Sequence, residues 1–240
     1  MKKACVRLHV EHPLGQGQAV PVEGGQAHYL FNVMRLRAGD AVLLFNGRDG
    51  EYTAHITQAG KRRGVLLCEA QTRAQDAPPD LWLLFAPVKK ARTDFIVEKA
   101  VEMGVRRLVP VRTDFTNAER FRLDKQQAHA VEAAEQCGAL MVPEVAPLQP
   151  LARVLDAWED RRILFADEAR AGRGSALAGD AADPWAVLIG PEGGFSESER
   201  ARLAAMAQVT PISLGPRILR AETAAVAALT LWQTTLGDWP

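Results

Sequence analysis

Residues 188–199 read LIGPEGGFSESE, and this stretch decides the fold of the larger part of the chain. The apolar run WAVLIG (185–190) leads into a glycine-rich turn, and Ser196 with Glu199 matches the S-x-x-E capping box that starts a helix. A buried strand that turns directly into a helix is the repeating unit of an α/β fold. Ligands of such folds bind beyond the carboxyl ends of the strands, so we favour a ligand-binding loop over a simple tight turn.

A second turn of the same kind reads LGPRILRAETA at residues 214–224. It also follows a predicted strand and opens a predicted helix. Its charged side chains Arg217, Arg220 and Glu222 indicate substrate handling, although a capped helix start with solvated charges would explain some of them. Because the two turns follow strands that are separated by one helix, they could together line a single pocket.

The pattern around these turns alternates between the two kinds of element from residue 81 onward. We expect strands at 81–87, 107–113, 163–166, 185–190 and 211–214, and helices at 93–104, 124–138, 148–158, 196–207 and 221–236. Strands that alternate with helices predict an α/β domain with a mostly parallel sheet.

The first seventy residues follow a different pattern. Short apolar or alternating segments predict strands at 4–10, 18–22, 41–47, 51–58 and 64–70, and one helix is predicted at 26–37. Asp49-Gly50 is a hairpin signal. We therefore predict a small β-barrel over residues 1–73, a linker over 74–80 that contains Pro78-Pro79, and the α/β domain over 81–240.

Composition excludes several classes of protein. The chain has 240 residues, of which 48% are hydrophobic and 24% charged, as in an ordinary globular protein. No apolar run approaches the ~18 residues of a membrane helix, and the N-terminus does not resemble a signal peptide. The three cysteines Cys5, Cys68 and Cys137 form no CxxC pair, which favours free thiols in a reducing cytoplasm over disulfides or zinc. The histidines show no spacing that suits a metal, and we predict none.

Charge is distributed unequally although the net charge is zero. Residues 1–73 carry ten Lys and Arg against six Asp and Glu, whereas residues 74–240 carry nineteen against twenty-three. A small basic lobe beside a mildly acidic one suggests a polyanion-binding module attached to a catalytic body.

The two turns together resemble the cofactor motifs of the SPOUT methyltransferases. The motif IGPEGG, followed by LGPRILRAET, is similar to the corresponding motifs of the RsmE family. Residues 28–37, 89–104 and 135–138 also resemble signatures of that family, so the resemblance spans essentially the whole chain in the expected order.

The resemblance implies both a fold and a reaction. The fold would be an N-terminal PUA-like barrel that docks RNA, followed by a SPOUT α/β domain with a deep trefoil knot. The reaction would be transfer of a methyl group from S-adenosylmethionine to N3 of a specific uridine in 16S rRNA. The partners implied are the rRNA, within the 30S subunit, and a second copy of the chain in a homodimer.

Site residues follow from the resemblance and from the chemistry of the side chains. The cofactor contacts are expected from the two turns, at Leu188, Ile189, Gly190, Glu192, Gly193, Gly194, Leu214, Gly215, Ile218, Leu219, Arg220 and Thr223. The expected RNA contacts are basic side chains and one histidine, namely Arg7, His28, Arg35, Arg37, Lys89, Lys90, Arg92 and Arg217.

Catalysis is expected from Arg220 and Glu222. Uridine N3 must lose its proton before it attacks a methyl group, so the site needs a proton acceptor and donors for the charge that develops on O2 and O4. Arg220 would stabilise that charge or hold a phosphate. Glu222 would be the base or would orient Arg220, and a structural ion pair at the helix start is an equal alternative.

Two other functions stay open, an RNA-binding protein without catalysis and a nicotinamide-dependent oxidoreductase, although the GxGxxG motif of the latter is absent.

Overall fold

The computed structural model describes residues 6–117, 120–172, 177, 179–180 and 183–239, and they form two compact units. The first unit comprises the described residues of Met1–Ala77 together with Ala134–Val142, and the second those of Pro78–Ala133 and Pro143–Pro240. The division differs from the expected one in one respect, because Ala134–Val142 packs with the N-terminal residues although it lies far along the chain.

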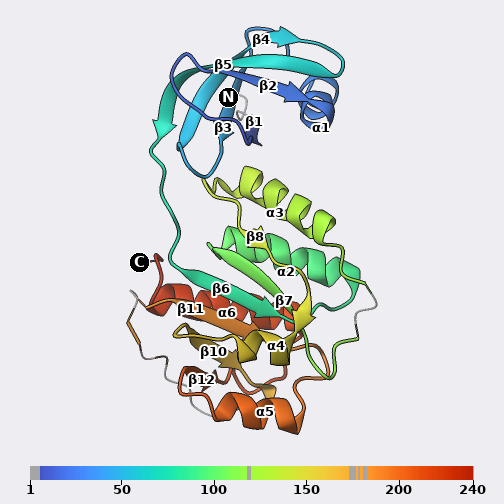
Figure 1. Ribbon diagram of the computed structural model, residues 1–240, viewed down its shortest axis with the longest axis vertical. Coiled ribbons are helices and arrows are strands. Elements are labelled where there is room, and N and C mark those ends of the chain that lie inside the picture. Colours follow the sequence, from blue (N-terminus) through green and yellow to red (C-terminus); the bar gives the residue numbers. More distant parts are fainter. Residues whose placement is uncertain (1–5, 118–119, 173–176, 178, 181–182, 240) are drawn as a thin grey trace. The chain divides into compact units, whose positions relative to one another are not determined.

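The first unit is built on a curled sheet of five strands in the order β1-β3-β4-β5-β2 (Figure 1). Its strands are β1 (Val6–His9), β2 (Ala19–Glu23), β3 (Ala41–Phe45), β4 (Glu51–Ala59) and β5 (Arg63–Arg73). Alternate side chains, such as those of Val20, Val22 and Leu66, are fully buried and form its core. The described strand pairings do not join the edge strands β1 and β2. They therefore show a curled sheet and not a fully hydrogen-bonded, closed barrel.

The helix predicted at 26–37 has other bounds and a different form. The chain forms α1 (Gly24–Ala27) and continues as a π-helix, η1 (His28–Val33). The helix ends there because Arg35 takes a left-handed conformation with φ 57°, and the N–H of Leu36 donates back to the carbonyl of Leu30 at 2.9 Å. Arg35 and Arg37 therefore lie in the turn that follows the helix.

The second unit contains a seven-stranded sheet in which every pair is parallel, which confirms the predicted mostly parallel sheet. The strand order is β12-β10-β11-β6-β7-β8, and β9 also pairs with β7. The strands are β6 (Leu81–Phe85), β7 (Arg107–Arg112), β8 (Glu144–Val145), β9 (Gln149–Pro150), β10 (Arg162–Ala166), β11 (Trp185–Ile189) and β12 (Val209–Ile212). The two-residue strands β8 and β9 were not predicted, because two residues are too few to show a period. β9 lies within the helix predicted at 148–158, of which only Leu151–Asp156 is helical.

Helices cover both faces of this sheet (Figure 1). They are α2 (Lys90–Glu102), α3 (Leu123–Cys137), α4 (Leu151–Asp156), α5 (Glu197–Ala204) and α6 (Ala221–Thr235), with a short 3₁₀ turn, η2 (Glu168–Arg170). Ala186 and Leu188 of β11 share a core cluster with Leu151 of α4 and Leu203 of α5. Side chains of a strand alternate between faces, so Val187 lies on the opposite face, where α6 packs against β11 and α2 against α6. In the described part of the chain, no helix is both long enough and apolar enough to cross a membrane.

Candidate functional site

Three neighbouring strands of the second unit end at the same edge of the sheet. Ala166 at the end of β10 is in register with Ile189 of β11 and with Ile212 of β12. The segments that leave these strands are therefore brought together at the carboxyl edge, where ligands of α/β sheets bind. The two glycine-rich turns singled out in the sequence are two of these three segments.

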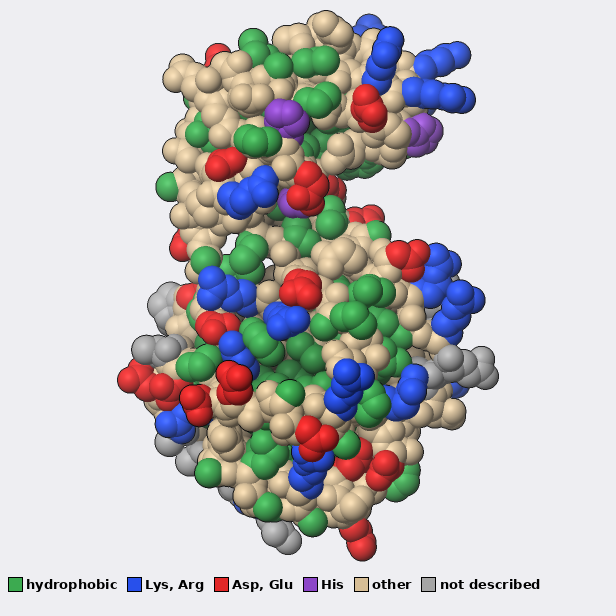
Figure 2. Space-filling view, viewed as in Figure 1, with side chains coloured by type: hydrophobic (Ala, Val, Ile, Leu, Met, Phe, Trp, Pro, Cys, Tyr) green, Lys and Arg blue, Asp and Glu red, His purple; other side chains and the backbone are tan. Residues whose placement is uncertain are grey.

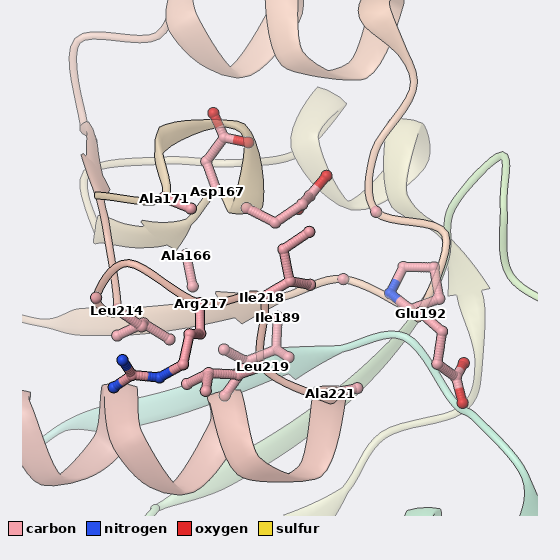
Figure 3. Close-up of a pocket in the computed structure, with 16 residues that line it drawn as sticks. Ala166, Asp167, Ala171, Ile189, Glu192, Leu214, Arg217, Ile218, Leu219 and Ala221 are labelled. Carbon is pink, nitrogen blue, oxygen red and sulfur yellow. The ribbon is translucent and has the colours of Figure 1, made fainter. Parts of the chain in front are cut away.

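A pocket of about 560 Å³, part of which is open to solvent, lies between the three segments (Figure 3). Eight of the twelve expected cofactor residues line it, namely Ile189, Gly190, Glu192, Gly194, Leu214, Gly215, Ile218 and Leu219. Arg217, which was expected to meet RNA, also lines it.

Four expected cofactor residues do not line this pocket. Leu188 is fully buried in the core between the sheet, α4 and α5, because it points to the other face from Ile189. Gly193, Arg220 and Thr223 are exposed to solvent outside the lining. The backbone turns that carry them are at the site, but these side chains face elsewhere.

The sequence analysis missed the third wall of the pocket. Ala166, Asp167, Glu168 and Ala171 come from the end of β10 and from η2. A strand was predicted at 163–166, so the rule that places ligands at strand ends could have indicated this segment as well.

Glycine is required at two positions of the lining. Gly194 has φ 69°, and a Cβ built on it would run into the carboxylate of Glu168. Gly215 has φ 108°, and a Cβ there would meet no protein atom within 4 Å. The space in front of Gly215 is therefore open, and a ligand can approach the backbone closely there.

The helix start after the first turn is already occupied by protein groups. Ser196 and Glu199 form the predicted capping box, in which the N–H of Ser196 donates to Glu199 at 2.9 Å. The Ser196 hydroxyl also donates to Asp114 at 2.5 Å. Because carboxylates already neutralise this helix end, it does not provide a free site for an anion.

The three carboxylates of the pocket lining are each paired with an arginine that lies outside the lining. Asp167, Glu168 and Glu192 line it against one cation, Arg217. Arg200 forms ion pairs with Asp167 at 3.2 Å and with Glu168. Burial alone would lower the pKa of Arg200, but the two carboxylates outweigh that effect and raise it, so Arg200 stays charged. In Figure 3, Glu192 and Arg217 lie on opposite sides of the group of side chains.

A junction of three charged residues lies beside the pocket. Arg92 of α2 contacts the carboxylate of Glu192 at 2.9 Å and that of Glu222 at 3.4 Å. The side chain of Glu222 is only 17% exposed, and its second oxygen is buried without a hydrogen-bond partner among the described residues. An ion pair at the start of α6 does exist, but its cation is Arg92.

Arg220 does not pair with Glu222, so the proposed role of Glu222 in orienting Arg220 is wrong. The backbone of Arg220 is the N-cap of α6, and its side chain is exposed. No ion pair of this side chain occurs within the described residues. Arg220 is therefore free to reach a ligand that lies in front of α6.

Arg7 serves the structure and does not face RNA, which corrects the prediction. Its side chain is 12% exposed and forms an ion pair with Glu51 at 2.7 Å. It also donates to the carbonyls of Ala134 at 2.7 Å and Ala139 at 2.8 Å, so its guanidinium is fully used inside the first unit.

Several other expected RNA contacts are available on the surface. His28, Arg35, Arg37 and Lys89 are exposed, whereas the side chain of Lys90 lies outside what the structure describes. His28 lines an open hollow of the first unit together with Glu23, Gly24, Asn32, Lys61 and Arg62. In Figure 2, Lys and Arg side chains gather at one end of this unit.

The site contains no evident metal centre. Among the described residues, no group of three His, Cys, Asp or Glu side chains could hold a metal ion. The described cysteines Cys68 and Cys137 are free thiols.

Two family models match the chain. The RNA methyltransferase domain matches residues 75–233, which include the whole pocket. The RNA methyltransferase PUA domain matches residues 22–67, within the curled sheet.

Individual proteins are similar over nearly the full length. The "Ribosomal RNA small subunit methyltransferase E" of Rickettsia conorii is 27% identical over 227 residues, 93% of each chain. That of Bacillus subtilis is 27% identical and covers 90% of each chain. The crystal structure of the Neisseria gonorrhoeae protein of that name, bound to S-adenosylmethionine, has a TM-score of 0.87 and 28% identity over 98% of this chain and 100% of its own. A Legionella pneumophila protein described as a methyltransferase, with bound S-adenosylmethionine, has a TM-score of 0.86 and 27% identity over 99% and 100%.

Proposed function

Since the chain belongs to the RNA methyltransferase family, we propose that it transfers a methyl group from S-adenosylmethionine to a uridine of the small-subunit ribosomal RNA. The observation that carries the proposal is the pocket at the ends of β10, β11 and β12. Its walls are the two motif turns, and it lies in the segment that the family model matches.

The pocket suits S-adenosylmethionine. The open space before Gly215 and the bend at Gly194 allow an adenosine to lie against the backbone of the two turns. Asp167, Glu168 and Glu192 also present carboxylate oxygens to the sulfonium and ammonium groups of this ligand, which would share them with Arg200 and Arg92. Bound there, the cofactor supplies a methyl group already activated by its positive sulfur, so the protein needs to provide only position, a proton acceptor and stabilisation of charge.

We assign the proton transfer to Glu222. One of its oxygens is held by Arg92, and the other is buried with no partner in the described part of the chain. An unpaired carboxylate oxygen can accept the proton from uridine N3 as the N3–methyl bond forms, and the thioether leaves. Arg220 is exposed in front of the same helix end and would stabilise the charge that develops on O2 or O4.

The remaining expectations belong to the same proposal. The first unit would dock the RNA, since its matched PUA segment includes the hollow of His28, Lys61 and Arg62. The protein would act in the cytoplasm as a homodimer on the 30S subunit. Its SPOUT domain would be knotted at the three segments that meet at the pocket.

The test is methyl transfer from labelled S-adenosylmethionine to small ribosomal subunits that lack the modification, followed by nucleoside analysis. The expected product is 3-methyluridine at one site. Transfer to another base would contradict the uridine assignment. Absence of both transfer and cofactor binding would favour an RNA-binding protein without catalysis.

Two variants test the assigned residues. We expect Arg220→Ala to lower turnover by about 10²–10³ and Glu222→Gln by about 10²–10⁴, because each removes a group that acts in the transition state. Cofactor affinity, measured by calorimetry, should stay within about twofold. Arg153→Ala, which removes another exposed arginine of the second unit, is the control. An equal loss of turnover and cofactor affinity would show that Arg220 does not act on the substrate.

A further inference from the structure

A second hollow of the second unit is lined by cations. It lies where α2 and α3 begin and has a volume of about 1410 Å³, part of it open solvent. Its lining combines four cations with polar and apolar groups, namely Lys89, Arg120, Arg122, Lys125, Thr93, Asn117, Gln126, Pro87, Val88 and Phe121. No Asp or Glu is among the described residues of this lining. In Figure 2, Lys and Arg side chains gather at this edge of the unit.

One wall of the hollow is a rigid turn. The Thr93 hydroxyl, which is buried, donates to the carbonyl of Val88 and accepts from its N–H, both at 3.0 Å. The turn leaves the side chain of Lys89 exposed. Its next residues include Arg92, whose N–H donates to the Lys89 carbonyl at 2.9 Å and whose side chain holds Glu222. One turn of α2 therefore contributes to both the hollow and the candidate proton acceptor.

Two of the four cations have no acidic partner among the described residues. Arg122 pairs with Asp124 at 2.7 Å, and Lys125 pairs with Asp94 at 3.1 Å. Within the described part of the chain, neither Lys89 nor Arg120 has an acidic partner. The hollow therefore keeps a positive charge, which suits a phosphate group.

The hollow also offers groups that suit a nucleoside. Gln126 is 4% exposed, and its amide nitrogen donates to Asp94 at 2.8 Å. Its carbonyl oxygen is then left as a buried acceptor with no partner among the described residues. A ribose hydroxyl or a base amino group is a donor that could satisfy it. Phe121 is half-buried on the same lining, and an aromatic ring can stack on a base.

We infer that this hollow, which we call the basic hollow, receives a nucleotide of the RNA strand that carries the target uridine. The inference rests on the proposed function for the identity of the strand. Lys89, Arg120 and Arg122 hold the phosphate, and Phe121 stacks on the base. Because Lys89 and Arg92 share one helix turn, this nucleotide lies close in sequence to the one that reaches Glu222.

The test measures binding of a ten-nucleotide oligouridylate and of unmodified small ribosomal subunits over a series of salt concentrations. We expect Arg120→Ala/Arg122→Ala to weaken oligonucleotide binding at least tenfold at low salt and to reduce the slope of log affinity against log salt by about 1. Phe121→Leu should weaken binding about tenfold without changing that slope, because stacking releases no counterions.

The matched control is Arg153→Ala/Arg202→Ala on α4 and α5. Like the test pair, it removes one arginine without an acidic partner among the described residues and one that pairs with an aspartate, here Asp156 at 2.7 Å. The control should bind like the wild type, and all variants should keep the wild-type affinity for S-adenosylmethionine.

Each outcome decides the inference. If the test variants bind RNA as tightly as the wild type, or if test and control variants lose equal affinity, the inference about the basic hollow is overturned. The proposed function still stands in that case if the wild type methylates the subunits. If the wild type methylates no subunits but its oligonucleotide binding still depends on Arg120 and Arg122, the hollow is supported and the proposed function fails. If the wild type binds neither the oligouridylate nor the ribosomal subunits, the inference about the basic hollow is also overturned.

Discussion

At the scale of single residues, Gly194 combines a left-handed backbone with a close approach to Glu168 at the pocket between the ends of β10, β11 and β12. Its φ of 69° is unfavourable for other residues, and a Cβ would displace the carboxylate of Glu168. We expect Gly194→Ala to weaken S-adenosylmethionine binding by roughly tenfold, about 1.4 kcal/mol, because the added Cβ forces Glu168 and the turn to shift in the pocket lining. Calorimetric titration with the cofactor measures this.

Gly25→Ala is the control for the Gly194 variant. Gly25 has no positive φ, and a Cβ there would meet nothing within 4 Å. Cofactor binding by this variant should be unchanged. If the Gly194→Ala variant bound the cofactor like the wild type, the bend at this position would not be needed.

A second residue-scale prediction concerns pH and Asp49. The N–H of Leu14 and the amide of Asn46 both donate to this carboxylate, at 2.9 and 2.7 Å, and they lower its pKa. A pKa that is lower in the folded state gives stability above the unfolded pKa, and this stability is lost as pH falls through the folded pKa. We expect Asp49→Asn to lower the free energy of unfolding by about 0.5–1 kcal/mol at pH 7, because solvent weakens both hydrogen bonds, and by almost nothing near pH 2.

Urea unfolding at pH 7, 4 and 2 checks the Asp49 prediction. Glu159→Gln, which changes the net charge equally at an exposed carboxylate outside the helices, should show no such pH-dependent difference. A constant difference between Asp49→Asn and the wild type at all three pH values would contradict the assignment.

Residue roles were predictable where a motif fixes the backbone. The eight lining residues of the two turns were expected from the resemblance of these turns to known cofactor motifs, and both turns follow strand ends. Arg7 was misplaced, because the sequence does not reveal that carbonyls of residues 134–139 surround it. The partner of Glu222 was also missed, because Arg92 comes from a helix far away along the chain.

At the scale of elements, Gln233 joins α6 to the end of α2. It is fully buried, and its amide nitrogen donates to the carbonyl of Met103 at 2.6 Å. We expect Gln233→Ala to lower the free energy of unfolding by about 2–3 kcal/mol, because it leaves that carbonyl without a partner and opens a cavity. Denaturant unfolding measures the change.

The neighbouring Thr234 provides the comparison for Gln233. It is exposed, and its hydroxyl bonds only within α6, to the carbonyl of Thr230 at 2.9 Å. Thr234→Ala should change stability by less than about 0.5 kcal/mol. Equal effects of the two variants would show that the contact between the helices contributes little.

Elements with a clear period were predictable from the sequence. The parallel strands β6, β7, β10 and β11 are apolar runs, and α5 and α6 begin at the predicted turns. The π-helix η1 was not predictable, because Tyr29, Val33 and Leu36 fit an ordinary helical spacing. The left-handed Arg35 that ends it is not a residue type that signals a turn.

At the scale of the whole molecule, the first unit depends on residues that lie far along the chain. Arg7 joins Glu51 of the sheet to the carbonyls of Ala134 and Ala139. We expect Arg7→Ala to cost about 3–5 kcal/mol of stability, because it leaves a buried carboxylate without its cation. Amide hydrogen exchange in 134–142 should also become faster.

Arg37→Ala is the control for the Arg7 variant, since Arg37 is an exposed arginine of the same unit. It should change neither the unfolding midpoint nor the exchange of 134–142. If Arg7→Ala destabilised the protein while exchange in 134–142 stayed slow, the ion pair with Glu51 alone would account for the loss.

Because the first unit is made of two separate chain segments, its coding sequence cannot be transferred to another gene as one continuous piece. A recombination breakpoint near codon 77 would transfer the curled sheet but leave behind Ala134–Val142, the segment that receives Arg7. In the transplanted sheet, Arg7 would then lack the carbonyl acceptors of Ala134 and Ala139. The first unit therefore could not be transferred alone by such a cut, and the two units would have to be inherited together.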